Sequence, residues 1–283
     1  MKIIQIIKEI QDLSFNLKQE GKTIGFVPTM GFLHEGHVRL VRAAKLECDV
    51  TVVSIFVNPA QFCPGEDFDK YPRDEKKDLC ILEKESVDIV FIPETREMYP
   101  DQSNTFVETE GSLIENLCGR TRPGHFKGVT TIVAKLLNVV LPDVAYFGQK
   151  DAQQAIVITR MIKDLNFPVK MRVMPIVREM DGLAMSSRNI YLLPEEREQA
   201  TSINKALSIA EKMFYNGENE SSVIKKTIIE QLNNNKNLKI DYVEIVDTER
   251  LEPVSTIETD VIIAIAAVVG ETRLIDNVIV RSS

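Results

Sequence analysis

The sequence lacks the cysteine and histidine patterns that mark zinc sites and disulfide frameworks. Its four cysteines, Cys48, Cys63, Cys80 and Cys118, are far apart and form no C-x-x-C pair, and no histidine stands at finger spacing from them. We therefore expect neither a zinc site nor a disulfide framework. Reduced thiols in the cytoplasm are the expected state.

Long apolar segments are also missing. The N-terminus runs from Met1 into Lys8 and Glu9 without a signal-type apolar core. The longest late apolar run, Val261 to Val269, is too short to span a bilayer. A soluble protein without membrane contact is expected.

Basic residues are fewer than acidic ones, with 34 Lys and Arg against 42 Asp and Glu. The chain carries a formal net charge of -8, with a pI of about 5.2. A surface for nucleic acid or for an anionic membrane usually needs a basic patch, so neither partner is expected. Any anionic ligand must be held by local cations. The 283 residues, 44% of them hydrophobic, suit a globular enzyme of one large or two modest domains.

Strands and helices alternate over the first 175 residues or so, which predicts a parallel sheet with helices on both faces. Short β-branched or aromatic runs predict buried strands at Thr23 to Val27, Val50 to Val57, Val87 to Ile92, Val144 to Phe147 and Val169 to Val173. Helices are predicted at His37 to Glu47, Glu75 to Glu85, Val129 to Val140 and Asp151 to Asp164. We assign residues 1–176 to this α/β, Rossmann-like domain, whose ligands should lie at the carboxyl ends of the strands.

The pattern changes beyond Val177. Two amphipathic helices are predicted at Pro194 to Tyr215 and Ser221 to Asn233, followed by strands at Ile240 to Val246, Val261 to Val269 and Arg273 to Val280. Residues 177–283 are therefore expected to form a smaller α+β domain with an antiparallel sheet.

The most informative segment is Pro28 to His37, PTMGFLHEGH, directly after the first predicted strand. If Leu33 onward is helical, His34 and His37 share one face of a helix N-terminus, where amide donors and the helix dipole favour an anion. Gly36 between them would let a flat group lie against the backbone. The alternative is a pair of surface histidines.

Two further segments could bind phosphate. Lys150 follows the fourth strand and precedes a helix, where its ammonium could reach a phosphate on a neighbouring loop; a solvated surface charge is the alternative. The segment Asp181 to Asn189 offers Gly182, paired serines and Arg188, and could close over a triphosphate. It could equally be a polar linker.

Neutral amides form another candidate set. Asn58, Gln61 and Gln154 could orient a small polar substrate by hydrogen bonds, with Phe62 or Met30 as an apolar wall. Gln153 and Gln154 could instead be surface residues. The peptide RPGHFKG at 122–128 could bind a carboxylate or order a lid, or it could be a turn with an exposed histidine.

As a set, the segments PTMGFLHEGH, FVNPAQF, RPGHFKGV, AYFGQKDAQQ and DGLAMSSRN resemble the pantothenate synthetase (pantoate-β-alanine ligase) family over essentially the whole chain. The H-x-G-H motif alone is shared with the wider nucleotidylyltransferase and class I aminoacyl-tRNA synthetase superfamily. The resemblance implies ATP-dependent formation of pantoyl adenylate with release of pyrophosphate, and then attack by β-alanine with release of AMP. It also implies Mg²⁺, a homodimer, and a C-terminal domain that closes over the active site.

The resemblance also assigns roles to individual residues. It implies that His37, His34 and Lys150 are catalytic and that Gln61 and Gln154 bind pantoate. The residues implied to bind ATP are Met30, Gly31, Phe32, Leu33, His34, Glu35, Gly36, His37, Gly148, Gln149, Lys150, Asp151, Val177, Met185, Ser186, Ser187 and Arg188. Gln149 stands where the family commonly has Glu, which removes a charge beside the nucleotide.

Three alternatives remain at this point. A plain nucleotidylyltransferase would stop at an adenylylated product and need no amine. A class I tRNA synthetase fragment is disfavoured because the last hundred residues show no obvious RNA-binding face. A nucleotide-binding regulatory module would perform no chemistry.

Overall fold

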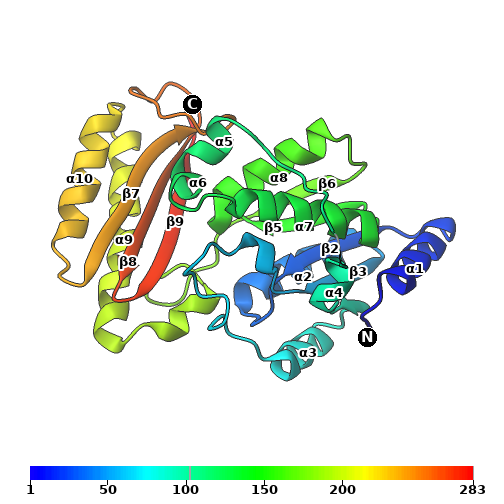
Figure 1. Ribbon diagram of the computed structural model, residues 1–283. Coiled ribbons are helices and arrows are strands. Elements are labelled where there is room, and N and C mark those ends of the chain that lie inside the picture. The colour runs from blue at the N-terminus through cyan, green and yellow to red at the C-terminus, as the bar shows by residue number, and fades with distance from the viewer. Residues whose placement is uncertain (102, 283) are drawn as a thin grey trace. The chain divides into compact units, whose positions relative to one another are not determined.

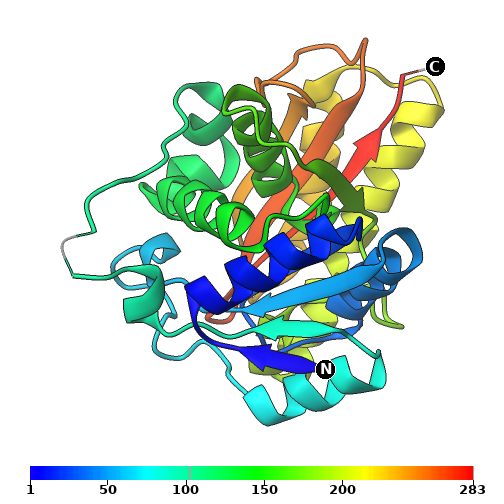
Figure 2. The same cartoon turned by 90° about the vertical axis from the view of Figure 1, so that its right-hand side faces the viewer.

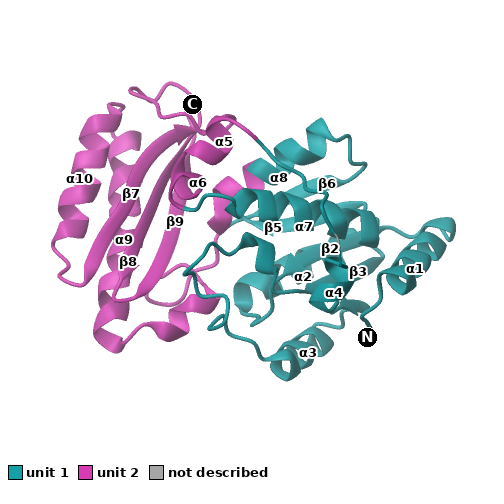
Figure 3. Cartoon of the chain, viewed as in Figure 1, with its two compact units in different colours: residues 1–109, 122–149, 157–175 teal, residues 110–121, 150–156, 176–283 magenta. Residues whose placement is uncertain are grey.

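A computed structural model describes residues 1–101 and 103–282 of the chain (Figure 1 and, turned by 90°, Figure 2). The chain forms two compact units (Figure 3). Unit 1 comprises residues 1–109, 122–149 and 157–175, and unit 2 comprises residues 110–121, 150–156 and 176–283. Two short segments before residue 176 therefore group with the C-terminal residues.

Unit 1 contains a six-stranded sheet in the order β1-β4-β3-β2-β5-β6, and every neighbouring pair is parallel. The strands are β1 (Lys2–Ile4), β2 (Ile24–Thr29), β3 (Val50–Ile55), β4 (Ile89–Phe91), β5 (Val144–Gly148) and β6 (Lys170–Met174). Apolar runs form the central strands because a parallel sheet between helical layers buries both of its faces. The predicted Rossmann-like α/β fold is confirmed.

Helices cover both faces of this sheet (Figure 2). α1 and α7 pack against each other and against β2 on one face. On the other face, side chains of α2 and α3 share an apolar cluster with Val27, Val53 and Val90 of the sheet. The helices and helical turns that lie wholly or partly in unit 1 are α1 (Ile7–Gln19), α2 (Glu35–Glu47), η1 (Pro59–Gln61), α3 (Glu75–Lys84), α4 (Thr95–Met98), α7 (His125–Val140), η2 (Gln149–Asp151) and α8 (Ala152–Asp164).

The strand order reverses between β2 and β5. β2 pairs with β3 as far as Thr29, but its pairing with β5 ends at Phe26. The carboxyl ends of β2 and β5 are therefore not joined by the ladder. In open α/β sheets such a reversal is where ligands bind, and here it lies between the starts of the PTMGFLHEGH and GQKD segments.

The boundaries differ from the sequence prediction in identifiable ways. β1 was not predicted, because three residues beside a polar helix give little signal. β6 was predicted as a buried strand, but most of its side chains are exposed because it lies at the edge of the sheet. α7 begins at His125 and not at Val129, since its first turn is held by contacts with η1 that periodicity does not reveal.

Unit 2 contains a three-stranded antiparallel sheet in the order β7-β8-β9, as predicted. Its elements are α5 (Ser112–Glu115), α6 (Leu117–Thr121), η3 (Ser187–Tyr191), α9 (Pro194–Tyr215), α10 (Ser221–Asn233), β7 (Leu238–Asp247), β8 (Val261–Val269) and β9 (Thr272–Val280). α9 and α10 pack on one face and form the main apolar cluster with the sheet.

The 110–121 segment contacts β7 and the loop after it. The Tyr242 hydroxyl lies 3.3 Å from Cys118 Sγ, and Asn116 donates to the Leu251 carbonyl at 2.9 Å.

β8 is apolar throughout because it is the central strand and nearly all of its side chains are buried. Within the described ranges, every helix is too short or too polar to cross a membrane.

Candidate active site

Two histidines hold the N-terminus of α2, the helix that follows β2. Nδ1 of His34 accepts a hydrogen bond from the Gly36 amide at 3.1 Å, and Nδ1 of His37 accepts one from the His34 amide at 3.3 Å. Their ring centroids are 4.1 Å apart. The imidazoles thus satisfy amides that a helix start leaves unpaired. The prediction that both rings lie together at a helix N-terminus is confirmed.

This capping arrangement decides which ring nitrogen can donate. Because Nδ1 accepts in both rings, each neutral imidazole carries its proton on Nε2. Two N–H donors at the positive end of a helix are suited to phosphate oxygens. The carboxylate of Glu35, by contrast, pairs with Arg42 at 2.7 Å, so Glu35 can serve an anion through its backbone only.

The turn before α2 has an unusual backbone. Gly31 has φ +81°, and Phe32, which is not a glycine, has φ +50°. Thr29 Oγ1 accepts from the Gly31 amide at 3.2 Å, and both Oδ atoms of Asp78 accept from the next two amides, those of Phe32 and Leu33, at 2.7 Å each. The turn is therefore held by side-chain acceptors and not by a regular ladder.

Asp78 comes from α3 and is only 1% exposed. Burial raises the pKa of its carboxyl group above the ordinary value of 3.8, while the amides of Leu33 and Phe32 oppose that rise. A buried carboxylate is costly unless it is fully hydrogen-bonded, and these two amides supply the bonds.

The amide side chains that follow β3 form a chain of hydrogen bonds. The Tyr99 hydroxyl is 2.8 Å from Asn58 Oδ1, and Asn58 Nδ2 donates to Gln61 Oε1 at 3.1 Å. Gln61 Nε2 in turn approaches Met30 Sδ at 3.1 Å. Gln61 and Met30 are thus brought together, as expected for an amide beside an apolar wall.

The backbone of helix α7 lies directly against the backbone of the η1 turn. A Cβ added to Gly128 would lie 2.1 Å from the Ala60 carbonyl oxygen, so only glycine fits there. The Gly128 carbonyl also accepts from Asn58 Nδ2 at 3.1 Å. This contact fixes the segment that carries Gln61.

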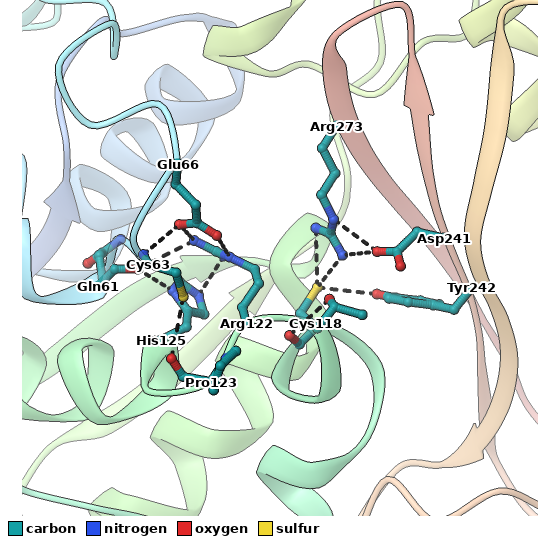
Figure 4. Close-up of polar contacts among 11 residues, drawn as sticks. Gln61, Cys63, Glu66, Cys118, Arg122, Pro123, His125, Asp241, Tyr242 and Arg273 are labelled. Atoms are coloured by element: carbon teal, nitrogen blue, oxygen red, sulfur yellow. Dashed lines mark hydrogen bonds and ion pairs between the residues drawn. The ribbon is translucent and has the colours of Figure 1, made fainter.

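His125 supports the same segment through its ring nitrogens (Figure 4). Its Nδ1 lies 2.7 Å from the Gln61 carbonyl, and its Nε2 lies 3.0 Å from Arg122 Nη1. Arg122 also forms an ion pair with Glu66, which lowers the pKa of that carboxyl below 4.5 although burial opposes the change. His125 is 7% exposed, so the alternative of a turn with an exposed histidine is wrong.

The segment after β5 crosses from unit 1 into unit 2. A Cβ added to Gly148 would meet no atom within 4 Å, so the backbone there is open to a ligand. In unit 2, the Lys150 carbonyl accepts from Asn277 of β9 at 3.0 Å. The Lys150 side chain is half-buried, with Nζ 3.5 Å from Asp151.

Residues 177–189 form a braced turn in unit 2. The Met185 amide donates to the Val177 carbonyl at 2.9 Å, and Arg178 bonds to Asp276 of β9 at 2.6 Å. Ser186 Oγ accepts from the Arg188 amide at 3.3 Å at the start of η3, which packs against β9. One strand therefore positions both Lys150 and the Ser-Ser-Arg turn.

The neighbouring glutamines of α8 have different surroundings. Gln153 is buried, accepts from the Cys118 amide at 2.9 Å and donates to the carbonyls of Leu113 and Asn116 at 2.8 Å each. It is thus a structural residue and not a surface one. Gln154 is half-buried, which leaves part of its side chain accessible to a ligand.

Figure 4 also shows a cation beside a thiol in unit 2. Arg273 bonds to Asp241 at 2.7 Å and places Nη2 3.6 Å from the sulfur of buried Cys118. These contacts tie the 110–121 segment to β7 and β9. No local pattern indicated this cluster, because Cys118 and its partners are more than a hundred residues apart.

The predicted ATP-binding residues fall into two groups by unit. Unit 1 holds Met30, Gly31, Phe32, Leu33, His34, Glu35, Gly36, His37, Gly148 and Gln149, and unit 2 holds Lys150, Asp151, Val177, Met185, Ser186, Ser187 and Arg188. Of the two pantoate candidates, Gln61 lies in unit 1 and Gln154 in unit 2. The described residues contain no cluster of three or more His, Cys, Asp or Glu side chains suited to a metal ion.

Two residues of the site were missed by sequence reasoning. Asp78 stands four residues before Leu82 and so lies on the buried face of α3, and an acid on an apolar helix face was the available signal. Tyr99 ends the short helix α4, and nothing in its local sequence links it to Asn58.

The sheet with its reversed strand order and the histidine-capped helix after β2 places the chain among α/β enzymes with an H-x-G-H motif. The family model described as pantoate-beta-alanine ligase matches residues 2–279. The chain therefore belongs to the pantoate-β-alanine ligase family. It is an enzyme that forms pantothenate, and the non-enzymatic module is excluded.

Relatives and solved structures agree over the full length. Pantothenate synthetases of Thermotoga petrophila and Caldicellulosiruptor bescii are 58% and 52% identical over 279 and 282 residues, covering 99% and 100% of both chains. The crystal structure of pantothenate synthetase from Thermus thermophilus matches with a TM-score of 0.93 and 41% identity over 98% of this chain and 99% of that one. The Francisella tularensis pantoate-beta-alanine ligase, complexed with beta-gamma ATP and beta-alanine, matches with a TM-score of 0.80 and 33% identity, covering 98% and 97%.

Proposed function

We propose that this chain condenses pantoate with β-alanine through an enzyme-bound pantoyl adenylate, using ATP as the second substrate. In the first step a pantoate carboxylate oxygen attacks the α-phosphorus, and the bond to the pyrophosphate oxygen breaks. In the second step the β-alanine amine attacks the acyl carbon, loses a proton, and expels AMP. The Francisella relative in complex with an ATP species and β-alanine supports both substrates.

The observation that carries this proposal is the pair of imidazoles at the start of α2. Attack of one anion on another requires that negative charge be compensated at the α-phosphate and at the departing pyrophosphate. His34 and His37 offer Nε2–H donors because their Nδ1 atoms are engaged in capping. Lys150 and Arg188 add permanent positive charge. ATP would be taken as its Mg²⁺ complex, and the metal would compensate part of the negative charge on the phosphates.

We assign the remaining roles from the resemblance of these segments to the family. The backbone of residues 30–37 and of Gly148 and Gln149 contacts the nucleotide, Lys150 and the turn Met185 to Arg188 contact its phosphates, and Asp151 contacts the nucleotide beside Lys150. At Val177 the carbonyl already accepts from Met185, so its backbone amide is the group offered to adenine. Gln61 and Gln154 bind pantoate, whose hydroxyl and carboxylate oxygens match neutral amide donors.

Gln149 in place of the usual Glu is compatible with this reaction. An amide keeps a hydrogen-bond acceptor for a ribose hydroxyl and removes one negative charge beside the triphosphate. We also propose that residues 177–283 act as a domain that closes over the site, because an acyl adenylate hydrolyses if water is admitted. A homodimer in the cytoplasm is the proposed working form.

A coupled assay of AMP and pyrophosphate release tests the proposed reaction. With ATP, Mg²⁺ and pantoate, pyrophosphate should appear in a single burst equal to the enzyme sites. Adding β-alanine should start continuous turnover, with AMP and pantothenate formed in equal amounts. Continuous AMP formation at a rate that does not depend on β-alanine contradicts the adenylate route. The absence of a pyrophosphate burst with ATP, Mg²⁺ and pantoate, before β-alanine is added, also contradicts it.

A further inference from the structure

The carboxylate of Asp78 joins two segments that are far apart in the sequence. Its Oδ2 atom accepts a hydrogen bond from the Phe32 amide and its Oδ1 atom accepts one from the Leu33 amide, each at 2.7 Å. These amides belong to the turn directly before His34, the residue that caps α2. Asp78 itself is on α3, whose axis is anchored by buried Leu82.

The turn cannot shift freely around this carboxylate. A Cβ added to Gly31 would lie 3.0 Å from Asp78 Oδ2 and 3.0 Å from a methyl carbon of Ile55. Phe32 adopts a left-handed φ of +50°, which costs free energy in a residue with a side chain. The two oxygens of Asp78 accept from the amides of Phe32 and Leu33, which offsets that cost and selects this one conformation.

A second contact comes from the same helix. The Lys77 ammonium lies 5.2 Å from the centroid of the Phe32 ring, a cation–π distance. Residues 77 and 78 of α3 thus hold the backbone and the side chain of the same turn. The position of α3 therefore determines the positions of Phe32 and Leu33, the two residues before His34.

We propose that Asp78 is a positioning residue for the adenylation step: its carboxylate holds the 31–33 turn so that His34 and His37 present their Nε2 donors to the phosphates. This inference rests on the proposed function of the histidine pair. Asp78 itself contacts no substrate. A carboxylate is required because both of its oxygens accept, whereas an asparagine would turn an NH₂ group toward one of the two amides.

The test compares Asp78→Asn with Asp74→Asn. Asp74 is the exposed N-cap of α3, accepts from the Lys77 amide at 3.1 Å, and does not touch the turn; an asparagine preserves that cap. Single-turnover rates, expressed per active site found by pyrophosphate burst, are independent of any unfolded fraction. Adenylation in Asp78→Asn should slow on the order of 10- to 100-fold, as expected for misplaced catalytic groups. Asp74→Asn should react at the wild-type rate.

The second half-reaction separates positioning from general damage. When pantoyl adenylate and β-alanine are supplied, Asp78→Asn should form pantothenate within about twofold of the wild-type rate, because no phosphate charge develops beyond that on AMP. Equal slowing of both half-reactions, or no slowing of adenylation, overturns the proposal. If the wild type itself shows no pyrophosphate burst, the proposed function fails and not this inference.

A measurement on the wild-type protein covers the case in which Asp78→Asn does not fold. The amide protons of Phe32 and Leu33 should resonate downfield and exchange slowly, as donors to a buried carboxylate do. Exchange of these two amides at the rate of an open loop would show that the carboxylate does not hold the turn, and the proposal would be abandoned.

Discussion

The Tyr99 hydroxyl donates a hydrogen bond of 2.8 Å to Asn58 Oδ1, the oxygen that also accepts from the Ala60 amide at 3.3 Å. With its oxygen occupied, Asn58 turns its NH₂ group to Gln61 Oε1 and to the Gly128 carbonyl, at 3.1 Å each. Gln61 then directs its own NH₂ group to Met30 Sδ, 3.1 Å away. A residue from the end of α4 therefore supports the Asn58 amide that holds Gln61, the residue proposed to bind pantoate.

Replacing Tyr99 tests whether this chain of hydrogen bonds supports the binding of pantoate. Burial raises the pKa of Tyr99 to about 12, so the hydroxyl stays protonated in any ordinary assay. Tyr99→Phe should raise the KM for pantoate about fivefold, the effect of one hydrogen bond, with kcat and the KM for ATP nearly unchanged. Steady-state kinetics with exposed Tyr215→Phe as the control provide the measurement. A matching rise in the KM for ATP would show a general disturbance instead.

Substitutions of the two capping histidines should affect the adenylation rate and the stability of the fold differently. His37→Ala should slow adenylate formation by a factor on the order of 10² to 10⁴, as expected when a group acting on transition-state charge is lost. His34→Asn retains a side-chain acceptor for the Gly36 amide, so its melting temperature should stay close to the wild type while adenylation falls similarly. Rapid-quench rates and thermal melts give the two readings. Near-normal adenylation in both variants would return the pair to the surface-histidine interpretation.

The two glutamines of α8 should respond differently to truncation. Gln154→Ala should weaken pantoate binding on the order of tenfold, with little change in ATP binding or stability. Gln153→Ala should lower stability by about 2 kcal/mol or more, because it leaves a buried amide and two carbonyls unpaired. Calorimetric titrations and urea unfolding distinguish them. Weakened ATP binding by Gln154→Ala would remove that residue from the pantoate site.

Arg188 should matter for only one half of the reaction. Arg188→Ala should raise the KM for ATP and slow adenylation on the order of 10²-fold, since pyrophosphate charge is left uncompensated. The second half-reaction, started from pantoyl adenylate, should be nearly unaffected because pyrophosphate has already left. Single-turnover measurements of each half provide the test. Equal slowing of both halves would mean that Arg188 supports the fold of the 177–189 turn.

Glu47 should contribute to stability in a defined pH range. Hydrogen bonds from Arg172 and from the Tyr146 hydroxyl lower the pKa of Glu47 from 4.5 to about 2. A depressed pKa in the folded state stabilises the fold above pH 4.5, and this stabilisation is lost as the pH falls through about 2. The effect is small because Glu47 and Arg172 are largely exposed and screened by salt.

Urea unfolding at several pH values tests this linkage. Glu47→Gln should lower the unfolding midpoint near neutral pH, and the difference from the wild type should shrink as the solution is acidified toward about pH 2. Glu83→Gln is the matched control, because Glu83 is an exposed carboxylate on α3. A difference that stays constant with pH would contradict the assigned pKa.

Periodicity predicted the elements with a strong local signal. The apolar runs of β2, β3, β5 and β8 are visible because each is buried on both sides. β1 and the early start of α7 were not visible, since they depend on partners elsewhere in the chain: β1 pairs with β4, and the first turn of α7 packs on η1.

The residues of the candidate site show the same distinction between local and distant partners. The placement of His34 and His37 side by side at a helix N-terminus could be predicted from their spacing of three residues, although their capping hydrogen bonds were not predicted. The roles of Asp78, Tyr99 and Gln153 could not be predicted, since their partners are 35 to 46 residues away. The buried position of His125 was also missed for this reason.

The observed capping role of His34 and its proposed role as an Nε2–H donor together limit the residues that can replace it. Asn, Asp or Ser would start the helix as well or better, but none offers an N–H donor at the reach of Nε2. Lys or Arg would offer a donor, but neither can accept from the Gly36 amide. A substitution there must satisfy two unrelated requirements at once, so position 34 should tolerate less variation than either requirement alone would impose.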